Sequence, residues 1–316
     1  MSQKIVFMGT PDFSVPTLKS LINSNHKVLA VYSQPPSKAH RGQKIISSSV
    51  EIITKENSLN LRTPISIDND EEYNFFQKIK PDLVVVIAYG QIIPKRFLRL
   101  AKNGFINVHA SLLPKWRGAA PIQRSIMNLD NQTGISIMKI VEELDAGPVM
   151  HQDKIQINEN VDALTLSKVL SKLGAKSIIN AIDKIEKGEA TFIEQDHGKA
   201  TYAKKILKTE GRINWNENAK KVLAKINGLN PNPGAWFEYK NERLKVWKAE
   251  IVNQNSNAGK ITDDRLTIAC KEQSIKILEI QREGKKVQKS VEFLLGSWIT
   301  KGSNLNSFNS GISLST

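Results

Sequence analysis

The sequence predicts an α/β fold in which a doubly wound, mostly parallel sheet is followed by a small β-barrel. Three observations support this prediction. Strand-like apolar runs alternate with helix-like segments through the first half of the chain, as in sheets built from βαβ units. Residues 82–88 (DLVVVIA) are almost continuously apolar and β-branched, which is typical of a central strand covered on both faces. Beyond about residue 230, short strand-like pieces separated by turns indicate a small barrel.

The first half opens with a strand over residues 4–9 (KIVFMG), followed by a turn rich in Gly, Pro and Asp. Pro16 agrees with a helix over residues 14–23, because proline is tolerated in the first turn. Residues 33–49 are polar, basic and interrupted by Pro and Gly, so we expect an exposed loop there. The other elements follow from apolar periodicity. They are strands at residues 28–32, 61–67, 82–88 and 104–109, and helices at 70–80, 94–101 and 162–187.

The pattern changes after the long helix expected to end at Gly188. Residues 191–212 carry five basic residues with little apolar periodicity, which suggests a linker. The strand-like pieces that follow are residues 235–239, 244–251, 265–269 and 275–281. We therefore expect four parts. They are a first domain over residues 1–190, a basic linker over 191–208, a barrel domain over 209–302 and a disordered tail over 303–316.

Composition excludes several classes of protein. The 316 residues are 40% hydrophobic, which is ample for buried cores and suggests two domains. No apolar run approaches the roughly 18 residues that cross a bilayer, and the N-terminus resembles neither a signal nor a transit peptide. We therefore expect a cytoplasmic protein without a membrane segment, and nothing demands more than a monomer. With Cys270 as the one cysteine and scattered histidines, we expect no metal site.

The charge balance is strongly basic. Lys and Arg number 45 against 31 acidic residues, which gives a net charge of +14 and a pI near 9.6. Residues 191–316 carry +8 of this charge and are more basic per residue than the rest. A basic surface favours a polyanion such as nucleic acid. A base-composition bias of the genome is the alternative explanation.

The stretch INVHASLLPKWRGAAPIQRSI, at the end of a predicted strand, contains the first candidate site. Asn107 and His109 share one face of the strand, with Val108 buried between them. Doubly wound sheets place their sites at such carboxyl ends. An amide can donate a hydrogen bond to an oxygen that becomes negative, and an imidazole can donate or transfer a proton. The pair suits attack on a carbonyl carbon, although an ordinary packed pair is the alternative.

A second candidate is the turn at residues 142–149 (EELDAGPV), which presents Asp145 next to Gly147. A carboxylate opposite His109 could orient the imidazole, hold its charge or accept a proton from a nucleophile. The alternative is that this sequence forms a simple polar turn without a role in catalysis. After the first strand only Gly9 is present where a dinucleotide-binding chain has G-x-G-x-x-G, so we expect no nicotinamide or flavin cofactor.

Five segments taken together resemble the methionyl-tRNA formyltransferase family. They are FMGTPDFS, VVVIAYGQIIP, NVHASLLPKWRGAAPIQRSI, TGISIMKIVEELDAGPVM and NGLNPNPGAWF. The resemblance runs to about residue 300 and implies a Rossmann-like formyltransferase domain followed by an OB-like domain that binds tRNA. It also implies that 10-formyltetrahydrofolate is a cosubstrate consumed at each turnover, that no cofactor is permanently bound, and that methionyl initiator tRNA accepts the formyl group.

The resemblance also implies roles for residues. Asn107 would donate to the developing oxyanion, His109 would stabilise that charge and help to protonate the departing N10, and Asp145 would orient the imidazole and assist loss of the amine proton. Two folate-binding segments are implied. They are the turn Ser111, Leu112, Leu113 and Pro114, and the strand end Ile87, Ala88, Tyr89 and Gly90.

For tRNA, the resemblance implies contacts from the loop over residues 34–49 and from the linker. The candidates are Arg41 and Lys44 in the loop and Lys204, Lys205 and Lys208 in the linker. Such lysines supply salt-sensitive affinity for phosphates rather than base readout. Two alternatives stay open. One is another formyl-transfer enzyme or a 10-formyltetrahydrofolate hydrolase on the same catalytic domain, and the other is a non-catalytic RNA-binding protein.

Overall fold

The structure is a computed structural model that describes residues 2–39 and 44–305. Its contacts divide the chain into two compact units, neither of which is continuous in sequence. The first unit comprises Met1–Pro121, Gln132–Ile155 and Ser167–Ala203. The second comprises Ile122–Asn131, Gln156–Leu166 and Lys204–Thr316.

The first unit is built on a seven-stranded sheet with the order β10-β9-β7-β6-β1-β2-β5. Its strands are β1 (Lys4–Gly9), β2 (Lys27–Tyr32), β5 (Leu61–Arg62), β6 (Leu83–Ile87), β7 (Phe105–His109), β9 (Gln132–Lys139) and β10 (Val149–Gln156). Five neighbouring strands are parallel, namely β5, β2, β1, β6 and β7, and β9 runs antiparallel to β7. The chain adds β2 and β5 on one side of β1 and β6 and β7 on the other. The order thus reverses beside β1, which is where such sheets bind ligands.

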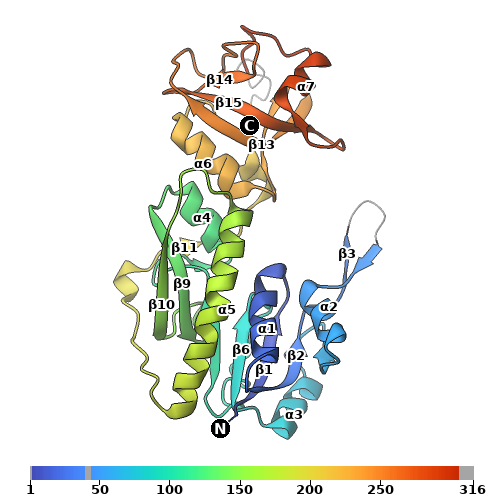
Figure 1. Cartoon of the computed structure of the whole chain (residues 1–316), viewed down its shortest axis with the longest axis vertical. Coiled ribbons are helices and arrows are strands. Elements are labelled where there is room, and N and C mark those ends of the chain that lie inside the picture. The colour runs from blue at the N-terminus through green and yellow to red at the C-terminus, as the bar shows by residue number, and fades with distance from the viewer. Residues whose placement is uncertain (1, 40–43, 306–316) are drawn as a thin grey trace, which may run out of the picture. The chain divides into compact units, whose positions relative to one another are not determined.

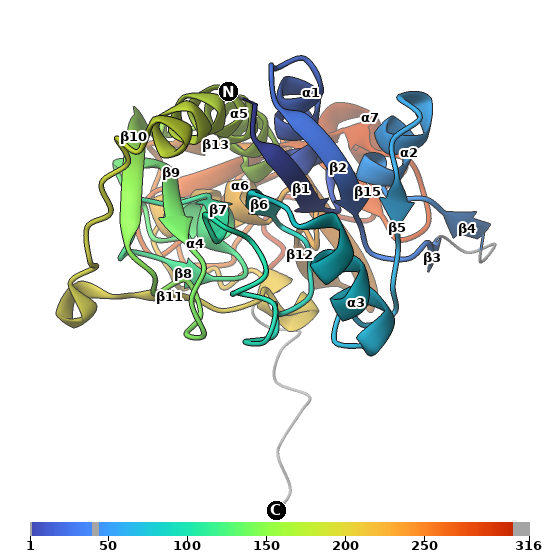
Figure 2. The same ribbon diagram turned by 90° about the horizontal axis from the view of Figure 1, so that it is seen from below.

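Helices cover both faces of this sheet (Figures 1 and 2). The helices are α1 (Val15–Ile22), α2 (Ser49–Glu56), α3 (Asp70–Ile79) and α5 (Ala163–Lys187). On the α3 face, Phe76 belongs to a buried cluster with Met8, Tyr32 and Phe105. On the opposite face, α5 passes so close to β7 that a Cβ on Gly174 would lie 2.7 Å from Val108. The predicted doubly wound, mostly parallel sheet is confirmed.

The second unit contains a five-stranded antiparallel sheet that forms a half-barrel. This confirms the prediction that a small barrel-like β-sheet follows the first domain. Its strands are β12 (Ala235–Tyr239), β13 (Glu242–Val252), β14 (Thr267–Ala269), β15 (Ser274–Arg282) and β16 (Gln288–Lys289), with order β12-β13-β15-β14 and β16 beside β15. The register of β13 against β15 shifts between Val246 and Ala249, and such bulges bend a strand. The helices of this unit include α6 (Ala219–Leu229) and α7 (Ser290–Leu295).

Two predicted elements were wrong. Residues 94–101 form turns closed by i to i+3 hydrogen bonds, such as Phe97 N to Pro94 O at 2.9 Å, instead of a helix. Phe97 is nevertheless fully buried, so its packing produced the apolar spacing that was interpreted as helical. The third strand extends only over Leu61–Arg62 instead of residues 61–67. Pro64 lacks an N–H. The Gln91 side chain instead donates to the carbonyls of Pro64 and Ile65 and accepts from the N–H of Ile67.

Several elements were not predicted. The segment expected to be an exposed loop holds a short hairpin of β3 (Ser37–Ala39) and β4 (Lys44–Ile46), and α2 begins at its end. The others are β8 (Arg117–Gly118), α4 (Pro121–Met127), β9, β10, β11 (Tyr202–Ala203), α6 and α7, together with single turns of 3-10 helix. Of these, β8 pairs in parallel with β11 and brings residues 117–118 beside residues 202–203.

Candidate active site

Asn107 and His109 lie at the carboxyl end of β7, on the face of the sheet opposite α5. Val108 between them is 3% exposed and packs toward Gly174 of α5, so the two polar side chains share the other face as the strand alternation predicts. Asn107 is half-buried, and among the described residues its side-chain amide makes no hydrogen bond. The amide is therefore available to an external ligand.

His109 is buried between two acceptors. Its Nε2 lies 2.8 Å from the carbonyl oxygen of Trp116, and its Nδ1 lies 3.6 Å from Oδ2 of Asp145. A carbonyl oxygen can only accept a hydrogen bond, so in the neutral ring the proton resides on Nε2. Nδ1 then carries no N–H that could donate to Asp145. The imidazolium would have one acceptor for each N–H. The arrangement can therefore support a positive ring during a reaction.

Asp145 is held in an unusual backbone conformation by its surroundings. Its φ of 49° is in the left-handed region, which costs free energy for a residue other than glycine. Its Oδ2 accepts a 2.8 Å hydrogen bond from the backbone N–H of Gly118. A Cβ on Gly147 would lie 2.0 Å from the carbonyl oxygen of Lys139, so only glycine fits two residues on. The turn thus fixes one carboxylate oxygen beside His109.

The turn from Ser111 to Pro114 is fixed by the neighbouring strands β9 and β10. The Ser136 hydroxyl donates to the carbonyl of Ser111 at 2.6 Å and accepts from the N–H of Leu113 at 3.0 Å. Gln152 donates to the carbonyl of Leu113 at 2.8 Å. Within the turn Ser111 and Leu113 are buried, while Leu112 and Pro114 are half-buried. These last two are the members that can meet a ligand.

The segment from Ile87 to Gly90 is similarly constrained at the end of β6. The carbonyl of Ile87 accepts from Ser14 Oγ at 2.7 Å, and that of Tyr89 accepts from Thr10 Oγ1 at 2.7 Å. Ile87 and Tyr89 are buried, whereas Ala88 and Gly90 are exposed. Burial raises the pKa of the Tyr89 hydroxyl well above its usual range, with Glu72 adding to the effect. Tyr89 is therefore a neutral core residue, and the accessible wall is Ala88 and Gly90.

Two residues of this region were missed by the sequence analysis. Arg117 is 3% exposed, and its Nε and Nη2 donate to Oε1 of Gln195 at 3.1 and 2.8 Å. Gln195 in turn donates from Nε2 to the carbonyl oxygens of Asp145 and Gly147, at 2.8 and 2.7 Å. Arg117 lies inside a motif that was singled out, but nothing in the sequence marks Gln195, which falls in the segment interpreted as a linker.

The residues expected to contact tRNA lie apart from Asn107, His109 and Asp145 in sequence, and the structure describes all but one of them. Arg41 lies outside the described residues, and Lys44 begins β4. Lys204, Lys205 and Lys208 are exposed members of the second unit. Their segment is fixed within that unit by Arg124 of α4, which donates to the carbonyl of Lys204 at 3.0 Å and pairs with Glu210 at 2.6 Å.

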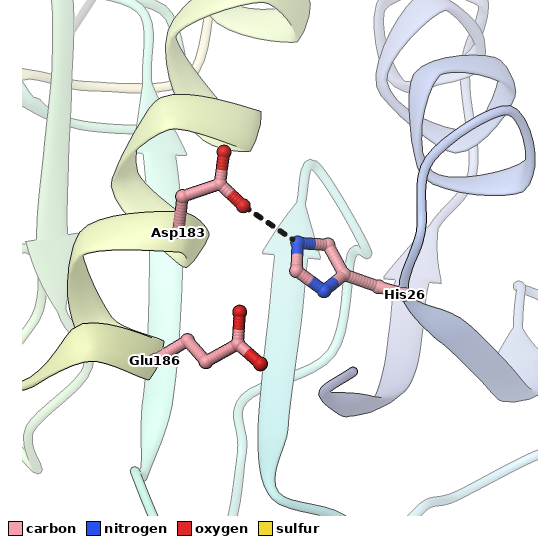
Figure 3. A group of neighbouring side chains, drawn as sticks. All are labelled: His26, Asp183 and Glu186. Carbon is pink, nitrogen blue, oxygen red and sulfur yellow. Dashed lines mark ion pairs between the residues drawn. The ribbon is translucent and has the colours of Figure 1, made fainter. Parts of the chain in front are cut away.

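One group of candidate metal ligands is present in the described part of the chain, formed by His26, Asp183 and Glu186 (Figure 3). His26 Nε2 lies 3.3 Å from Oδ1 of Asp183, and its Nδ1 accepts from the backbone N–H of Gln3 at 3.4 Å. The neutral ring therefore carries its proton on Nε2, which leaves that nitrogen no lone pair for a metal. His26 directly precedes β2, and Asp183 and Glu186 belong to the last turns of α5. The group therefore lies at the amino ends of the parallel strands, whereas His109 lies at a carboxyl end. Over residues 2–39 and 44–305, none of the helices is long and apolar enough to cross a membrane.

Comparisons with known proteins extend over nearly the whole chain. The family described as "Formyl transferase" matches residues 3–182, and "Formyl transferase, C-terminal domain" matches residues 205–297. A methionyl-tRNA formyltransferase of Pelagibacter ubique is 54% identical over 307 residues, which cover 96% of this chain and 99% of the relative. A methionyl-tRNA formyltransferase of Thermodesulfovibrio yellowstonii is 41% identical, with 96% and 98% covered.

Solved structures show a similar fold at low sequence identity. An N-formyltransferase from Helicobacter canadensis, in complex with folinic acid and dTDP-3-aminofucose, has a TM-score of 0.69 at 18% identity and covers 88% of this chain and 99% of that one. HypX from Aquifex aeolicus, in complex with tetrahydrofolic acid, has a TM-score of 0.66 at 16% identity, with 93% and 47% covered. At these identities the likeness concerns the fold alone.

Proposed function

This chain belongs to the formyl transferase family, and we propose that it transfers the formyl group of 10-formyltetrahydrofolate to the α-amine of methionyl initiator tRNA. The observation that carries the proposal is the arrangement at the end of β7. There, the free amide of Asn107 lies two residues from a His109 that faces the Asp145 carboxylate. Relatives named methionyl-tRNA formyltransferase match both units, which supports tRNA as the acceptor.

The proposed reaction needs one negative oxygen stabilised and one proton moved. The amine nitrogen bonds to the formyl carbon, the bond from that carbon to N10 breaks, and one proton passes overall from the amine to N10. Asn107 donates to the oxyanion of the tetrahedral intermediate. Asp145 assists loss of the amine proton and holds the imidazolium of His109, which stabilises the oxyanion and helps to protonate N10. To release a proton, His109 must give up one of its two protein contacts.

The proposed folate site lies beside these residues in the first unit. Leu112 and Pro114 would meet the cosubstrate from the turn after β7, and Ala88 and Gly90 would meet it from the end of β6. Because β6 and β7 are adjacent parallel strands, both segments lie at the same edge of the sheet. The structures of HypX with tetrahydrofolic acid and of the Helicobacter canadensis enzyme with folinic acid support a folate in this fold.

The proposed tRNA contacts are Arg41 and Lys44 in the segment over residues 34–49 and the exposed lysines Lys204, Lys205 and Lys208. We propose a catalytic part over residues 1–190, a basic linker over 191–208 and a tRNA-binding part over 209–302, followed by the tail 303–316. A tRNA acceptor agrees with a net charge of +14. We also propose that the chain works in the cytoplasm, where initiator tRNA is used. We propose a monomer, since nothing in the sequence demands more than one copy.

The test is formyl transfer from 10-formyltetrahydrofolate, measured side by side with methionyl initiator tRNA, methionyl elongator tRNA and free methionine. We expect formylated product with the initiator tRNA and at most slow reaction with the other two. Release of formate without an acylated product would instead identify a hydrolase. Absence of any folate turnover would overturn the proposal.

A further inference from the structure

Arg117 is a buried cation whose side chain pairs with a neutral amide. The residue is 3% exposed, and in the described part of the chain no carboxylate lies within ion-pair distance of its side chain. The hydrogen-bonding partner of its side chain is the amide oxygen of Gln195, which accepts from both Nε and Nη2. Burying a charge against a neutral group costs free energy that an apolar side chain of similar size would avoid. The arrangement therefore needs an explanation other than stability.

The guanidinium determines which way the Gln195 amide points. An amide has an oxygen that accepts and a nitrogen that donates, and a guanidinium only donates. The oxygen must therefore face Arg117, and the nitrogen must face away from it. In this orientation Nε2 donates to the carbonyls of both Asp145 and Gly147. Reversing the amide would place two donors against the guanidinium and an acceptor against two carbonyls.

The carbonyls that Gln195 holds belong to the turn that carries Asp145. The left-handed backbone of Asp145 is costly and persists only where its surroundings fix it. Two hydrogen bonds from a buried side chain supply such a constraint from outside the turn. On the other side, the Asp145 carboxylate is fixed by the N–H of Gly118, which follows Arg117 directly in β8. Adjacent residues of one strand thus control both the backbone and the carboxylate of Asp145.

We propose that Arg117 and Gln195 are positioning residues for formyl transfer, which hold the Asp145 turn so that its carboxylate stays opposite His109. The proposal rests on the role proposed above for Asp145. Neither residue needs to touch a substrate. A displacement of about 1 Å at a reacting group can lower the rate about 100-fold, so losing this constraint lowers kcat. The KM values for folate and tRNA depend on other residues and stay near those of the wild type.

The informative variant is Gln195→Glu, which separates folding from positioning. The new carboxylate keeps both hydrogen bonds from Arg117 and pairs with its charge, so the buried cation gains a partner. It has no donor for the carbonyls of Asp145 and Gly147. We expect kcat to fall about 100-fold while the thermal midpoint does not drop. Gln77→Glu is the matched control, since Gln77 is exposed in α3 of the first unit and should leave kcat unchanged.

A double-mutant cycle with Asp145→Asn distinguishes positioning from a general structural defect. If Gln195 acts through Asp145, adding Gln195→Glu to Asp145→Asn lowers kcat by less than about threefold further. The same large factor in both backgrounds would overturn the proposal, as would a Gln195→Glu enzyme with wild-type kcat or with a raised KM alone. If Asp145→Asn itself leaves kcat unchanged, the role proposed for Asp145 fails first, and the two failures are distinguishable.

Arg117→Lys tests the other half of the pair. A lysine offers a single ammonium in place of the planar fork and does not fix the amide in the same way. We expect kcat to fall with unchanged KM values, as for Gln195→Glu. Wild-type kcat in Arg117→Lys would remove Arg117 from the proposal and leave Gln195 alone as the positioning residue.

Discussion

His109 differs from an ordinary packed histidine because both of its ring nitrogens face oxygen acceptors. Trp116 supplies a carbonyl to Nε2 and Asp145 a carboxylate to Nδ1. A neutral imidazole can satisfy only one of them, and an imidazolium can satisfy both. The Asp145 carboxylate is thus the group that lets the site carry a positive ring while a negative oxygen forms nearby. Its charge, more than its volume, should matter for the reaction.

Replacing Asp145 by Asn tests this at the residue scale. The amide keeps the size of the side chain and an oxygen for the N–H of Gly118 but removes the negative charge. We expect kcat for formyl transfer to fall by about 10²–10⁴, the usual range for losing acid–base assistance, with tRNA affinity unchanged. Glu143→Gln removes the same charge from an exposed position of the same turn and should keep wild-type kcat. If tRNA binding were lost together with activity, Asp145 would be structural.

At the scale of elements, what sequence periodicity could predict was limited to local patterns. The alternation of β7 placed Asn107 and His109 correctly because one strand face contains both. The contact between Arg117 and Gln195 joins residues 78 positions apart, and no local pattern reports such a pair. Helix α6 was missed although its signal is present, since Asn218 caps its first turn and buried Val222 and Ile226 are four residues apart.

The segment that leads into the second unit is fixed by an ion pair between elements. Arg124 of α4 and Glu210 of a 3-10 helix (Lys208–Gly211) approach to 2.6 Å, and both side chains are partly exposed. The hydrogen bond from Arg124 holds the pKa of the Glu210 carboxyl below its ordinary value. A carboxyl with a lowered folded-state pKa contributes stability above its unfolded pKa, and this stability is lost as pH falls through the folded pKa.

Glu210→Gln should therefore destabilise the protein by about 1–2 kcal/mol at pH 7, a figure reduced by solvent screening of this partly exposed pair. The difference from the wild type should shrink as pH falls below about 4, where the wild-type carboxyl becomes protonated as well. Urea unfolding of both proteins between pH 3 and pH 7 measures this. Glu283→Gln, at an exposed site of the same unit, serves as the control. A difference that stays constant over this range would show that the charge of Glu210 is not the cause.

At the scale of the whole molecule, a net charge of +14 gives any polyanion a general attraction that must be separated from specific contacts. Each phosphate contact contributes about 0.7–0.9 to the slope of log affinity against log salt concentration, whereas a diffuse charge contributes little. Removing lysines that contact RNA should therefore reduce the salt slope. Removing the same number of scattered lysines should leave the slope unchanged, although the net charge falls equally. The salt slope can thus decide whether the exposed lysines at residues 204–208 belong to the tRNA contact surface.

The last prediction compares two triple variants that both lower the net charge by three. Lys204→Gln, Lys205→Gln and Lys208→Gln together should weaken tRNA binding and reduce the salt slope by about 2–3. The control changes Lys78, Lys102 and Lys187 to Gln. These lysines are exposed in the first unit, at the end of the sheet opposite His109, and their loss should leave the slope unchanged. Filter binding of methionyl initiator tRNA from 50 to 200 mM salt measures both, a range over which several phosphate contacts change affinity by orders of magnitude. Equal slopes in the two variants would mean that the lysines act only through net charge, and the tRNA contacts would then have to come from other residues of this basic chain.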